Sequence, residues 1–409
     1  MDGVFCAIGA GSGARSDKQC DEELENRAIR RVLLAGLQRW CLDVSAWGDL
    51  SSHQWDVLLE LLPEDERSRV KNFRRENDQR LALGSRLLQR AVVSKVFGLK
   101  SSDVTIRRTS ERKPYFVGVA EAIRRGTVSP LLKNWNFNVS HHGKFVAIAS
   151  EPVCLCGVDI VDTERRSNER GPADDYFRYF TQHFTDSEWG AIKRGVNDES
   201  KLRRFYLNWG LKEAYVKAVG QGLGYDLRRV SFVEGDWLDC SSSVKDFADA
   251  SGRRTCRCPR KALKSFDMAS NRELRHGVPC DFKSESEEYR AESGDHEEVL
   301  EALLWKQEDV VGCTCGLGTA AVKVDGIPRP DWSFQVFTLP DRYAACVARG
   351  PPSECSSVGQ AAGVISDPNV GGDTYRQGQT LPQLRFREVK LADIIPPEAA
   401  QKMDDLRTL

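Results

Sequence analysis

Two stretches decide the fold of this chain: Gly157-Val158-Asp159-Ile160-Val161 and, further along, Trp209-Gly210-Leu211-Lys212-Glu213-Ala214-Tyr215-Val216-Lys217. The first predicts a strand, in which one acid, Asp159, interrupts an apolar run. The second predicts a helix on which Glu213 and Lys217, one turn apart, lie on the same face. The carboxylates of Asp159 and Glu213 can then meet over one magnesium ion if phosphate oxygens of a substrate complete its coordination.

The bulk composition excludes several classes of protein. The 409 residues are 40% hydrophobic, which suffices for two or three domains with a core. Lysine plus arginine (59) and aspartate plus glutamate (60) leave a net charge of -1, so no overall field attracts nucleic acid or an anionic membrane. No stretch reaches the ~20 apolar residues of a membrane span, and the N-terminus lacks the pattern of a signal or transit peptide. We therefore expect a soluble cytoplasmic protein with no nucleic-acid and no membrane partner.

The cysteines do not form a recognisable metal or disulfide framework. There are 13 of them, an odd number. Three pairs have a single intervening residue instead of the roughly two to four typical of zinc-binding pairs: Cys154/Cys156, Cys256/Cys258 and Cys313/Cys315. Free thiols in a reducing compartment are the better interpretation.

The first 150 residues contain a tail followed by one structural unit. Residues 1–36 are rich in Gly, Ser and charge, and we expect a flexible N-terminal tail. Residues 37–150 form the N-terminal half, which begins with an alternating strand at 39–44. A helix opens at Pro63 with acids in its first turn. A longer helix runs from about Asp78 to Phe97 and ends before Gly98, and a strand follows at 104–106.

The same order of elements returns in residues 151–350, the C-terminal half. A short helix starts at Thr185, a longer one covers Phe205 to Val219 and is closed by Gly220, and a strand covers 230–232. Two strands joined by a His-Gly turn lie between the halves, and residues 332–348 predict a closing hairpin. We therefore predict an α+β fold of two similar halves related by a pseudo-twofold axis, with the ligand site at their interface and a monomeric state.

Two segments predict little fixed structure. Residues 240–299, approximately, are rich in Ser, Arg, Lys and Glu and poor in aromatics, so they predict a flexible insert within the C-terminal half. Residues 351–409 are rich in Gly, Pro and Ser and predict a mostly disordered tail.

Three separated motifs together resemble the Sfp-type 4′-phosphopantetheinyl transferases, and most closely their animal and plant branch, typified by the enzyme that acts on aminoadipate-semialdehyde dehydrogenase. They are residues 136–141, residues 157–160, and residues 209–217 with 220–223 after them. The resemblance implies transfer of the phosphopantetheine arm of coenzyme A to a serine of apo carrier proteins, as in a holo-[acyl-carrier-protein] synthase. Magnesium would be the metal, adenosine 3′,5′-bisphosphate the product, and acyl or peptidyl carrier domains or a lysine-pathway reductase the acceptors.

The resemblance also assigns roles to particular residues. Asp159 and Glu213 would bind the metal, and together with Lys217 they would be the catalytic residues. The coenzyme would be bound by Arg69, Arg108, Thr109, Ser110, Glu111, Arg112, Lys113, Asn138, Val139, Ser140, His141, Asp159 and Lys217. Where the bacterial branch has a second acid this chain has Val161, so a water would fill that position of the metal.

Other interpretations of the same residues remain open. A coenzyme A-binding protein could keep this fold without turnover, and a hydrolase could release the arm to water. Glu213 with Lys217 alone would be an ordinary surface ion pair, worth ~0.3–0.5 kcal/mol on a helix. Lys212 lies off the face that carries these two residues, so it ranks after Lys217 as a contact of the substrate.

Overall fold

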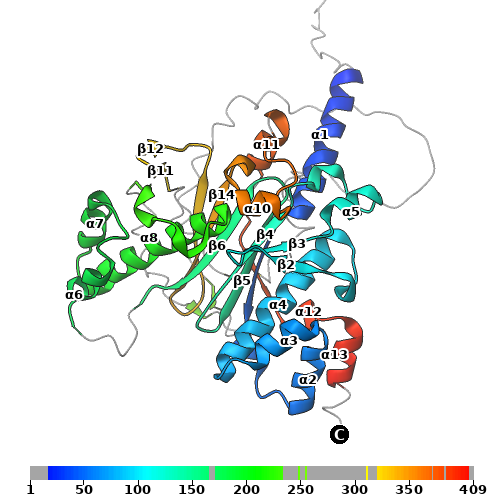
Figure 1. Ribbon diagram of the computed structural model, residues 1–409, viewed down its shortest axis with the longest axis horizontal. Helices are drawn as coiled ribbons and strands as arrows, with labels where there is room; N and C mark the ends of the chain where they lie inside the picture. The colour runs from blue at the N-terminus through cyan, green and yellow to red at the C-terminus, as the bar shows by residue number, and fades with distance from the viewer. Residues whose placement is uncertain are drawn as a thin grey trace, which may run out of the picture.

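The computed structural model describes an α+β protein in which two sheets meet edge to edge with helices packed on them (Figure 1). The described residues are 17–164, 171–233, 320–370, 372–381 and 384–404, with three two-residue strands at 247–248, 254–255 and 310–311. Within these ranges no helix is both long and apolar enough to cross a bilayer.

The larger sheet has the strand order β10-β15-β1-β5-β4. Strand β1 (Gln38–Asp43) runs antiparallel to β5 (Phe145–Glu151), which pairs antiparallel with β4 (Asn136–His142). The turn between β4 and β5 contains Gly143 at φ 61°, a conformation that glycine adopts without steric cost. The predicted first strand and the predicted hairpin are both confirmed.

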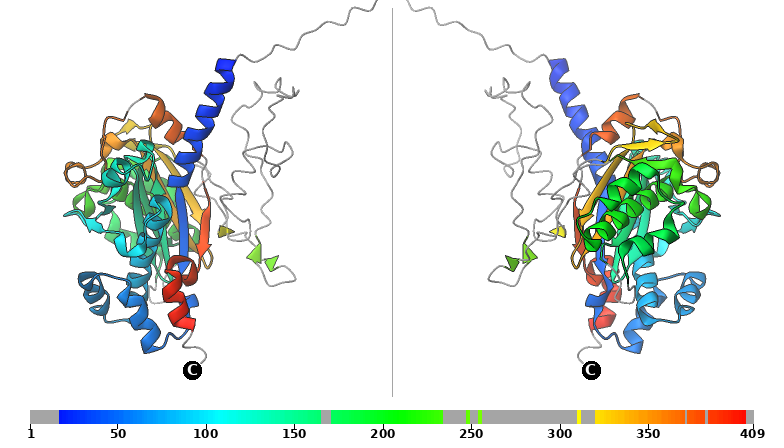
Figure 2. Two further views of the ribbon diagram at one scale, coloured as in Figure 1. Left: turned by 90° about the vertical axis from the view of Figure 1, so that its right-hand side faces the viewer. Right: turned by 90° about the vertical axis from the view of Figure 1, so that its left-hand side faces the viewer.

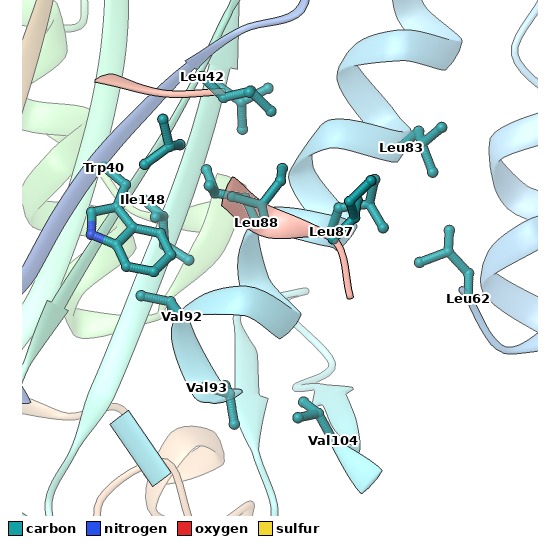
Figure 3. Close-up of a cluster of buried hydrophobic side chains, with 14 of the residues drawn as sticks. Trp40, Leu42, Leu62, Leu83, Leu87, Leu88, Val92, Val93, Val104 and Ile148 are labelled. Carbon is teal, nitrogen blue, oxygen red and sulfur yellow. The ribbon is translucent and has the colours of Figure 1, made fainter. Parts of the chain in front are cut away.

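Helix α4 (Glu76–Phe97) lies on one face of this sheet, α3 (Glu64–Lys71) packs on α4, and α2 (Ser52–Glu60) adds Leu58 to the same core. The apolar stripe of α4 packs against the sheet, so that Leu88 and Val92 lie close to Trp40 and Ile148 in the core (Figure 3). Helix α4 ends at Gly98, whose φ of 65° is the left-handed conformation that stops a helix. Helices α3 and α4 start within two residues of the predicted positions and α4 ends where predicted, whereas α2 was not predicted.

The smaller sheet has the order β13-β14-β6, and one long helix lies on it. Its strands are β6 (Leu155–Asp162), β13 (Ser333–Thr338) and β14 (Tyr343–Gly350), all antiparallel neighbours. The long helix is α8 (Asp198–Val219), and the shorter helix α7 (Asp186–Lys193) precedes it along the chain. Helix α8 starts seven residues earlier than predicted, because the side chain of Asn197 accepts a hydrogen bond from Ser200 N and caps it there.

Helix α8 and strand β6 approach each other through glycine. A Cβ on Gly157 would lie 1.9 Å from the carbonyl oxygen of Ala214, and one on Gly210 would lie 2.8 Å from Cys346 Sγ. No side chain larger than hydrogen fits at Gly157 without moving the helix. The motif glycine therefore sets the distance between the strand of Asp159 and the helix of Glu213.

The two sheets are joined by side chains across β4 and β6. Backbone N–H groups of β6 at Cys156, Val158 and Ile160 donate to the Asn136 and Asn138 amide oxygens and to Ser140 Oγ, at 2.9, 3.0 and 3.3 Å. Because the other edge of β6 pairs with β14, this arrangement gives these buried N–H groups partners without a continuous backbone ladder.

Both chain ends are more ordered than the sequence indicated. Residues 17–36 form helix α1 (Asp17–Gly36), and its last turns bury Leu33 and Leu34, so the prediction of a flexible tail is wrong for this part. This short apolar stripe was missed in the sequence because the first turns of the helix are highly charged. Residues 1–16 lie outside the described residues.

The predicted disordered C-terminal tail is wrong as well. It contains α10 (Ser357–Ala361), α11 (Gly372–Gln379), β15 (Phe386–Val389), α12 (Leu391–Ile394) and α13 (Pro397–Asp404). Strand β15 adds to the larger sheet parallel to β1, and α13 packs near α2, where Gln54 donates to Met403 O at 3.2 Å (Figure 2). Apolar residues of these short elements, such as the buried Phe386, pack against residues that are far away in sequence. The prediction was wrong because it relied on the local Gly and Pro content.

The remaining described elements are short, and one of them carries the expected coenzyme-binding segment. The hairpin of β2 (Ile106–Arg108) and β3 (Pro114–Phe116) presents that segment. The others are α5 (Val119–Arg124), α6 (Ala173–Phe177), β7 (Val230–Phe232), β8 (Phe247–Ala248), β9 (Arg254–Thr255), β10 (Val310–Val311), β11 (Val322–Val324) and β12 (Ile327–Pro328). Apart from β8 and β9, the predicted insert at about 240–299 lies outside the described residues.

Candidate active site

Helix α8 has one open stripe, and it carries the predicted acid and base. Over its last four turns the side chains are buried except for Tyr206, Trp209, Glu213 and Lys217, which are half-buried. Their spacing of three or four residues places them on one face. The stripe is the side of α8 that a substrate can reach.

Strand β6 brings Asp159 to that stripe. Asp159 is only 8% exposed, and its Oδ1 accepts hydrogen bonds from Lys217 Nζ at 2.5 Å and from Ser140 Oγ at 2.9 Å. Lys217 Nζ also donates to Ser140 Oγ at 2.9 Å. The Ser140 hydroxyl, which also accepts from Ile160 N, thereby uses its one donor and both acceptor positions, and it holds the acid and the base together.

Glu213 lies within electrostatic reach of the same pair. Burial raises the pKa of Glu213, the negative charge of Asp159 raises it further, and the positive charge of Lys217 lowers it. Two carboxylates that share a partly buried place disfavour each other's ionised form. A cation between them would remove that penalty, so the donor set fits a divalent metal.

The metal ligands from the protein would be two carboxylates. No cluster of three or more His, Cys, Asp or Glu side chains suited to a metal occurs among the described residues. Val161, at the position where the bacterial branch has a second acid, is buried and packs close to Gly210 of helix α8. Magnesium prefers six oxygen ligands and often keeps water or substrate oxygens, so two protein ligands are compatible with it.

A group of arginines lies beside this site. Burial lowers the pKa of Arg86, Glu66 opposes that effect, and the charges of Arg108 and Arg69 lower it further. Burial lowers the pKa of Arg108 as well, Glu66 opposes that effect, and the charges of Arg69 and Arg112 lower it further. The arginines of α3, α4 and the β2–β3 hairpin thus lie within electrostatic reach of one another, and such a group suits phosphate.

Arg86 is a residue that the sequence interpretation missed. It comes from α4, its Nη1 donates to the Ala82 carbonyl at 2.7 Å, and its buried Nε has no hydrogen-bond partner. The signal in the sequence was a pair of arginines, Arg86 and Arg90, one turn apart within an apolar helix. Arg90 pairs with Glu66 at 3.2 Å, whereas Arg86 has no carboxylate in contact among the described residues.

His141 connects the arginines to Lys217. Neighbouring atoms exclude water from part of the His141 ring, although the residue as a whole is exposed, and this desolvation lowers the pKa of His141. The positive charges of Lys217, His142 and Arg86 lower it further. A neutral imidazole next to cations can both donate to and accept from an anionic ligand or its ordered water.

Other residues predicted to bind coenzyme have different surroundings. Ser110 is exposed, and Ser110 Oγ donates to Glu111 Oε1 at 2.7 Å, while Glu111 Oε2 is buried without a hydrogen-bond partner. As an acceptor, Glu111 suits an amine or hydroxyl of a ligand and not a phosphate. Val139 is half-buried and packs against the core, and the amide oxygen of Asn138 is used by Val158 N.

Thr109 and Lys113 face inward. Thr109 is buried, and its Oγ1 accepts a hydrogen bond from Lys113 N at 3.1 Å. Lys113 is 5% exposed, and its Nζ donates to three backbone carbonyl groups at 2.7–3.0 Å. All three N–H groups of the ammonium are thus used, which gives the predicted coenzyme-binding role of Lys113 no support from its contacts.

Lys212 has a structural role away from the open stripe. Its buried Nζ donates to Glu188 Oε2 and to the Leu227 carbonyl, both at 2.9 Å, and burial lowers its pKa. Glu188 is also the partner in the capping box of α7. Lys212 therefore ties α8 to α7 and does not face the site.

Two family models match consecutive segments of the chain. Residues 45–153 match the family described as 4′-phosphopantetheinyl transferase, N-terminal, and residues 155–265 match the 4′-phosphopantetheinyl transferase superfamily. The chain belongs to this superfamily. The first match contains the arginines and His141, and the second contains Asp159, Glu213 and Lys217.

The relatives bear the same family name. The chain is 31% identical over 205 residues, 50% of this chain and 64% of the relative, to the L-aminoadipate-semialdehyde dehydrogenase-phosphopantetheinyl transferase of Xenopus laevis. The corresponding protein of Rattus norvegicus is 33% identical over 195 residues, 47% of this chain and 59% of the relative. A phosphopantetheinyl transferase of Thraustochytrium sp. is 34% identical over 203 residues, 48% of this chain and 66% of the relative. The chain thus spans less than two thirds of the length of these relatives, and the predicted kinship to the aminoadipate branch is confirmed.

Proposed function

We propose that this protein transfers the 4′-phosphopantetheine arm of coenzyme A to a serine hydroxyl of apo carrier proteins. The observation that carries the proposal is the meeting of Asp159, Glu213 and Lys217 on an open stripe, with four arginines and His141 nearby. Coenzyme A presents a diphosphate and a 3′-phosphate, and such a distribution of cations is complementary to both.

The coenzyme would be held mainly by cations. Lys217 would face the diphosphate, because it already lies against the acid that would share the metal. Arg69 of α3 and Arg108 and Arg112 of the hairpin are exposed and open to a phosphate, and Arg86 of α4 has a buried Nε without a hydrogen-bond partner. Glu111 would accept from a donor such as the adenine amine or a ribose hydroxyl.

Asp159 and Glu213 would hold a magnesium ion. When bound, that ion would neutralise negative charge that develops on the diphosphate as its bond breaks. The residues fit it because both are carboxylates and because burial, and then the negative charge of Asp159, raises the pKa of Glu213. Lys217, bonded to Asp159, would shift its ammonium toward the phosphate oxygens once the carboxylate is engaged.

The reaction makes one bond and breaks one. The serine oxygen bonds to the phosphorus that carries the pantetheine arm, the bond from that phosphorus to the bridging oxygen breaks, and adenosine 3′,5′-bisphosphate leaves. The serine proton passes to Glu213 or to a water beside it. A carboxylate that binds a metal is a weak base, so we rank Glu213 as a ligand first and as a base second.

The finer features of the proposal follow the same reasoning. The two 22-residue helices α4 and α8, each closed by a left-handed glycine, support a duplicated, pseudo-twofold fold with the site between its halves. The activity would be that of a holo-[acyl-carrier-protein] synthase, and the names of the relatives add an aminoadipate-semialdehyde dehydrogenase of lysine metabolism as a candidate acceptor. A cytoplasmic monomer completes the proposal.

Mass spectrometry of apo carrier proteins tests this function directly. The full chain would be incubated with coenzyme A, magnesium and either an apo acyl carrier protein or the carrier domain of an aminoadipate reductase. A mass gain of one phosphopantetheine on the acceptor serine is expected, and it should disappear in Asp159→Asn and Glu213→Gln, which keep the side-chain shape and remove the charge. Coenzyme A binding without any gain on either carrier would favour a non-catalytic coenzyme A-binding protein, and free phosphopantetheine would indicate a hydrolase.

A further inference from the structure

The C-terminus of helix α8 is completed by its own cap residue, Gly220, and by groups from two other parts of the chain. The last four carbonyl groups of a helix have no partner within it. Here Gly220 N donates to the Val216 carbonyl at 2.8 Å, and Ser356 N donates to the Val219 carbonyl at 2.9 Å. The two carbonyls between them, of Lys217 and Ala218, accept from Lys113 Nζ at 2.7 and 3.0 Å.

The same ammonium also reaches the strand of the site. Lys113 Nζ donates to the carbonyl oxygen of Cys156 in β6 at 3.0 Å, three residues before Asp159. One buried cation therefore contacts both the helix that carries Glu213 and Lys217 and the strand that carries Asp159. A positive charge at the negative end of the helix dipole is favourable as well.

Lys113 itself is fixed within the coenzyme-binding hairpin. Thr109 N donates to the Lys113 carbonyl at 3.0 Å, and Lys113 N donates back to Thr109 Oγ1 at 3.1 Å. Arg108, which precedes this closed turn, and Arg112, which lies within it, are exposed. The backbone of the turn that carries Arg112 and follows Arg108 is therefore connected, through the Lys113 side chain, to helix α8 and strand β6.

We propose that Lys113 is a positioning residue: through the carbonyl groups of Lys217, Ala218 and Cys156 it holds the coenzyme-binding hairpin in register with the catalytic strand and helix. The inference rests on the proposed transferase function and differs from it in denying Lys113 a contact with coenzyme. Its ammonium is buried and fully hydrogen-bonded, whereas a phosphate ligand would need a free N–H group. Burial lowers the pKa of Lys113 to about 8, so keeping this side chain charged in the folded protein costs free energy.

The first experiment measures coenzyme A affinity by calorimetry, without a carrier, at several salt concentrations. It compares the parent, Lys113→Met and Arg108→Met, a cation of the same hairpin. A phosphate contact weakens as salt screens it, so Arg108→Met should bind less tightly and with a flatter salt dependence. Lys113→Met should keep the salt dependence of the parent, and a flatter one would overturn the proposal.

The second experiment separates kcat from KM in the transfer assay. A displacement of about 1 Å in a catalytic group can cost on the order of 100-fold in rate, so kcat of Lys113→Met should fall about 10- to 100-fold, more than its coenzyme affinity. The milder Lys113→Gln, which keeps an amide donor, should recover part of that loss. Unchanged kcat with only a lower unfolding temperature would show a purely structural role and overturn the proposal.

The third experiment does not measure the activity of any variant, so its result is valid even if Lys113→Met does not fold. The side-chain carbon next to the Lys113 ammonium is followed by NMR in isotope-labelled parent protein while pH is varied, with and without coenzyme A, and Lys113→Gln assigns the signal. The midpoint of this titration should stay the same when coenzyme A binds. A rise in the midpoint would reveal a phosphate contact and overturn the proposal. Because this measurement uses binding alone, it remains decisive if the parent transfers nothing and the proposed function fails.

Discussion

Replacing Gly157 with alanine would put a methyl group where strand β6 and helix α8 are closest. The new carbon would lie 1.9 Å from the Ala214 carbonyl oxygen and 2.6 Å from Ala218 N, whereas ordinary contact begins near 3.4 Å. Both neighbours are backbone atoms, so the helix must move away by roughly 1 Å or more. Overpacking of this kind costs typically ~1–3 kcal/mol, and rigid backbone places Gly157→Ala at or above the upper end.

The displacement would also reach the site. Ala214 follows Glu213 and Ala218 follows Lys217, so the two residues that the methyl group pushes are the neighbours of the acid and the base. The 2.5 Å bond from Lys217 Nζ to Asp159 Oδ1 would lengthen. We expect the free energy of unfolding to fall by about 3 kcal/mol or more and turnover to fall on the order of 100-fold in whatever fraction remains folded.

Urea unfolding followed by tryptophan fluorescence measures the first effect, and the carrier-protein assay measures the second. Gly190→Ala is the matched control, because Gly190 is an exposed position within α7 with no atom within 4 Å of its added carbon. The free energy of unfolding of that variant should rise by ~0.5–1 kcal/mol, because alanine is more stable than glycine in a helix interior. If Gly157→Ala unfolded at the same urea concentration as the parent and kept full turnover, the close packing of β6 on α8 would be refuted.

Three further predictions concern the arginines, the chain end and the buried lysine. Arg86→Met should weaken coenzyme A binding about 10- to 100-fold, which corresponds to the loss of one charged hydrogen bond. Calorimetry with coenzyme A and with dephospho-coenzyme A shows whether the partner of Arg86 is the 3′-phosphate. Unchanged affinity for both ligands would show that Arg86 is not part of the site. Ending the chain at residue 383 removes β15 and α13 with the buried Phe386, so the free energy of unfolding should drop by several kcal/mol, and an unaltered urea midpoint would contradict the packing against β1. Since burial lowers the pKa of Lys113 to about 8 while the unfolded chain keeps that proton to about 10.4, stability should rise with pH across this window, by at most about 3 kcal/mol, relative to Lys113→Met. The comparison with Lys113→Met cancels the opposite effect of the facing Cys156 and Cys355 thiols, whose pKa values are raised by burial, and a difference that is flat with pH would contradict the burial of the ammonium.

The sequence alone determined the features that depend on neighbours along the chain. Period, caps and left-handed glycines are local, so α4 and α7 and the ends of α8 at Gly220 and of α4 at Gly98 could be predicted. The chemistry of the site was equally visible, because an acid within an apolar strand and an acid and base one helical turn apart are patterns of residue type and spacing.

The tertiary structure decided which of those groups meet and what each is free to do. Ser140 is committed to Asp159, Lys113 completes the end of α8, and Arg86 joins a group of arginines from three elements. These outcomes depend on hydrogen bonds and charges between residues far apart in sequence, whose separation no local pattern encodes. The same reason explains β15, which is ordered because an open edge of β1 accepts it and not because of its own composition.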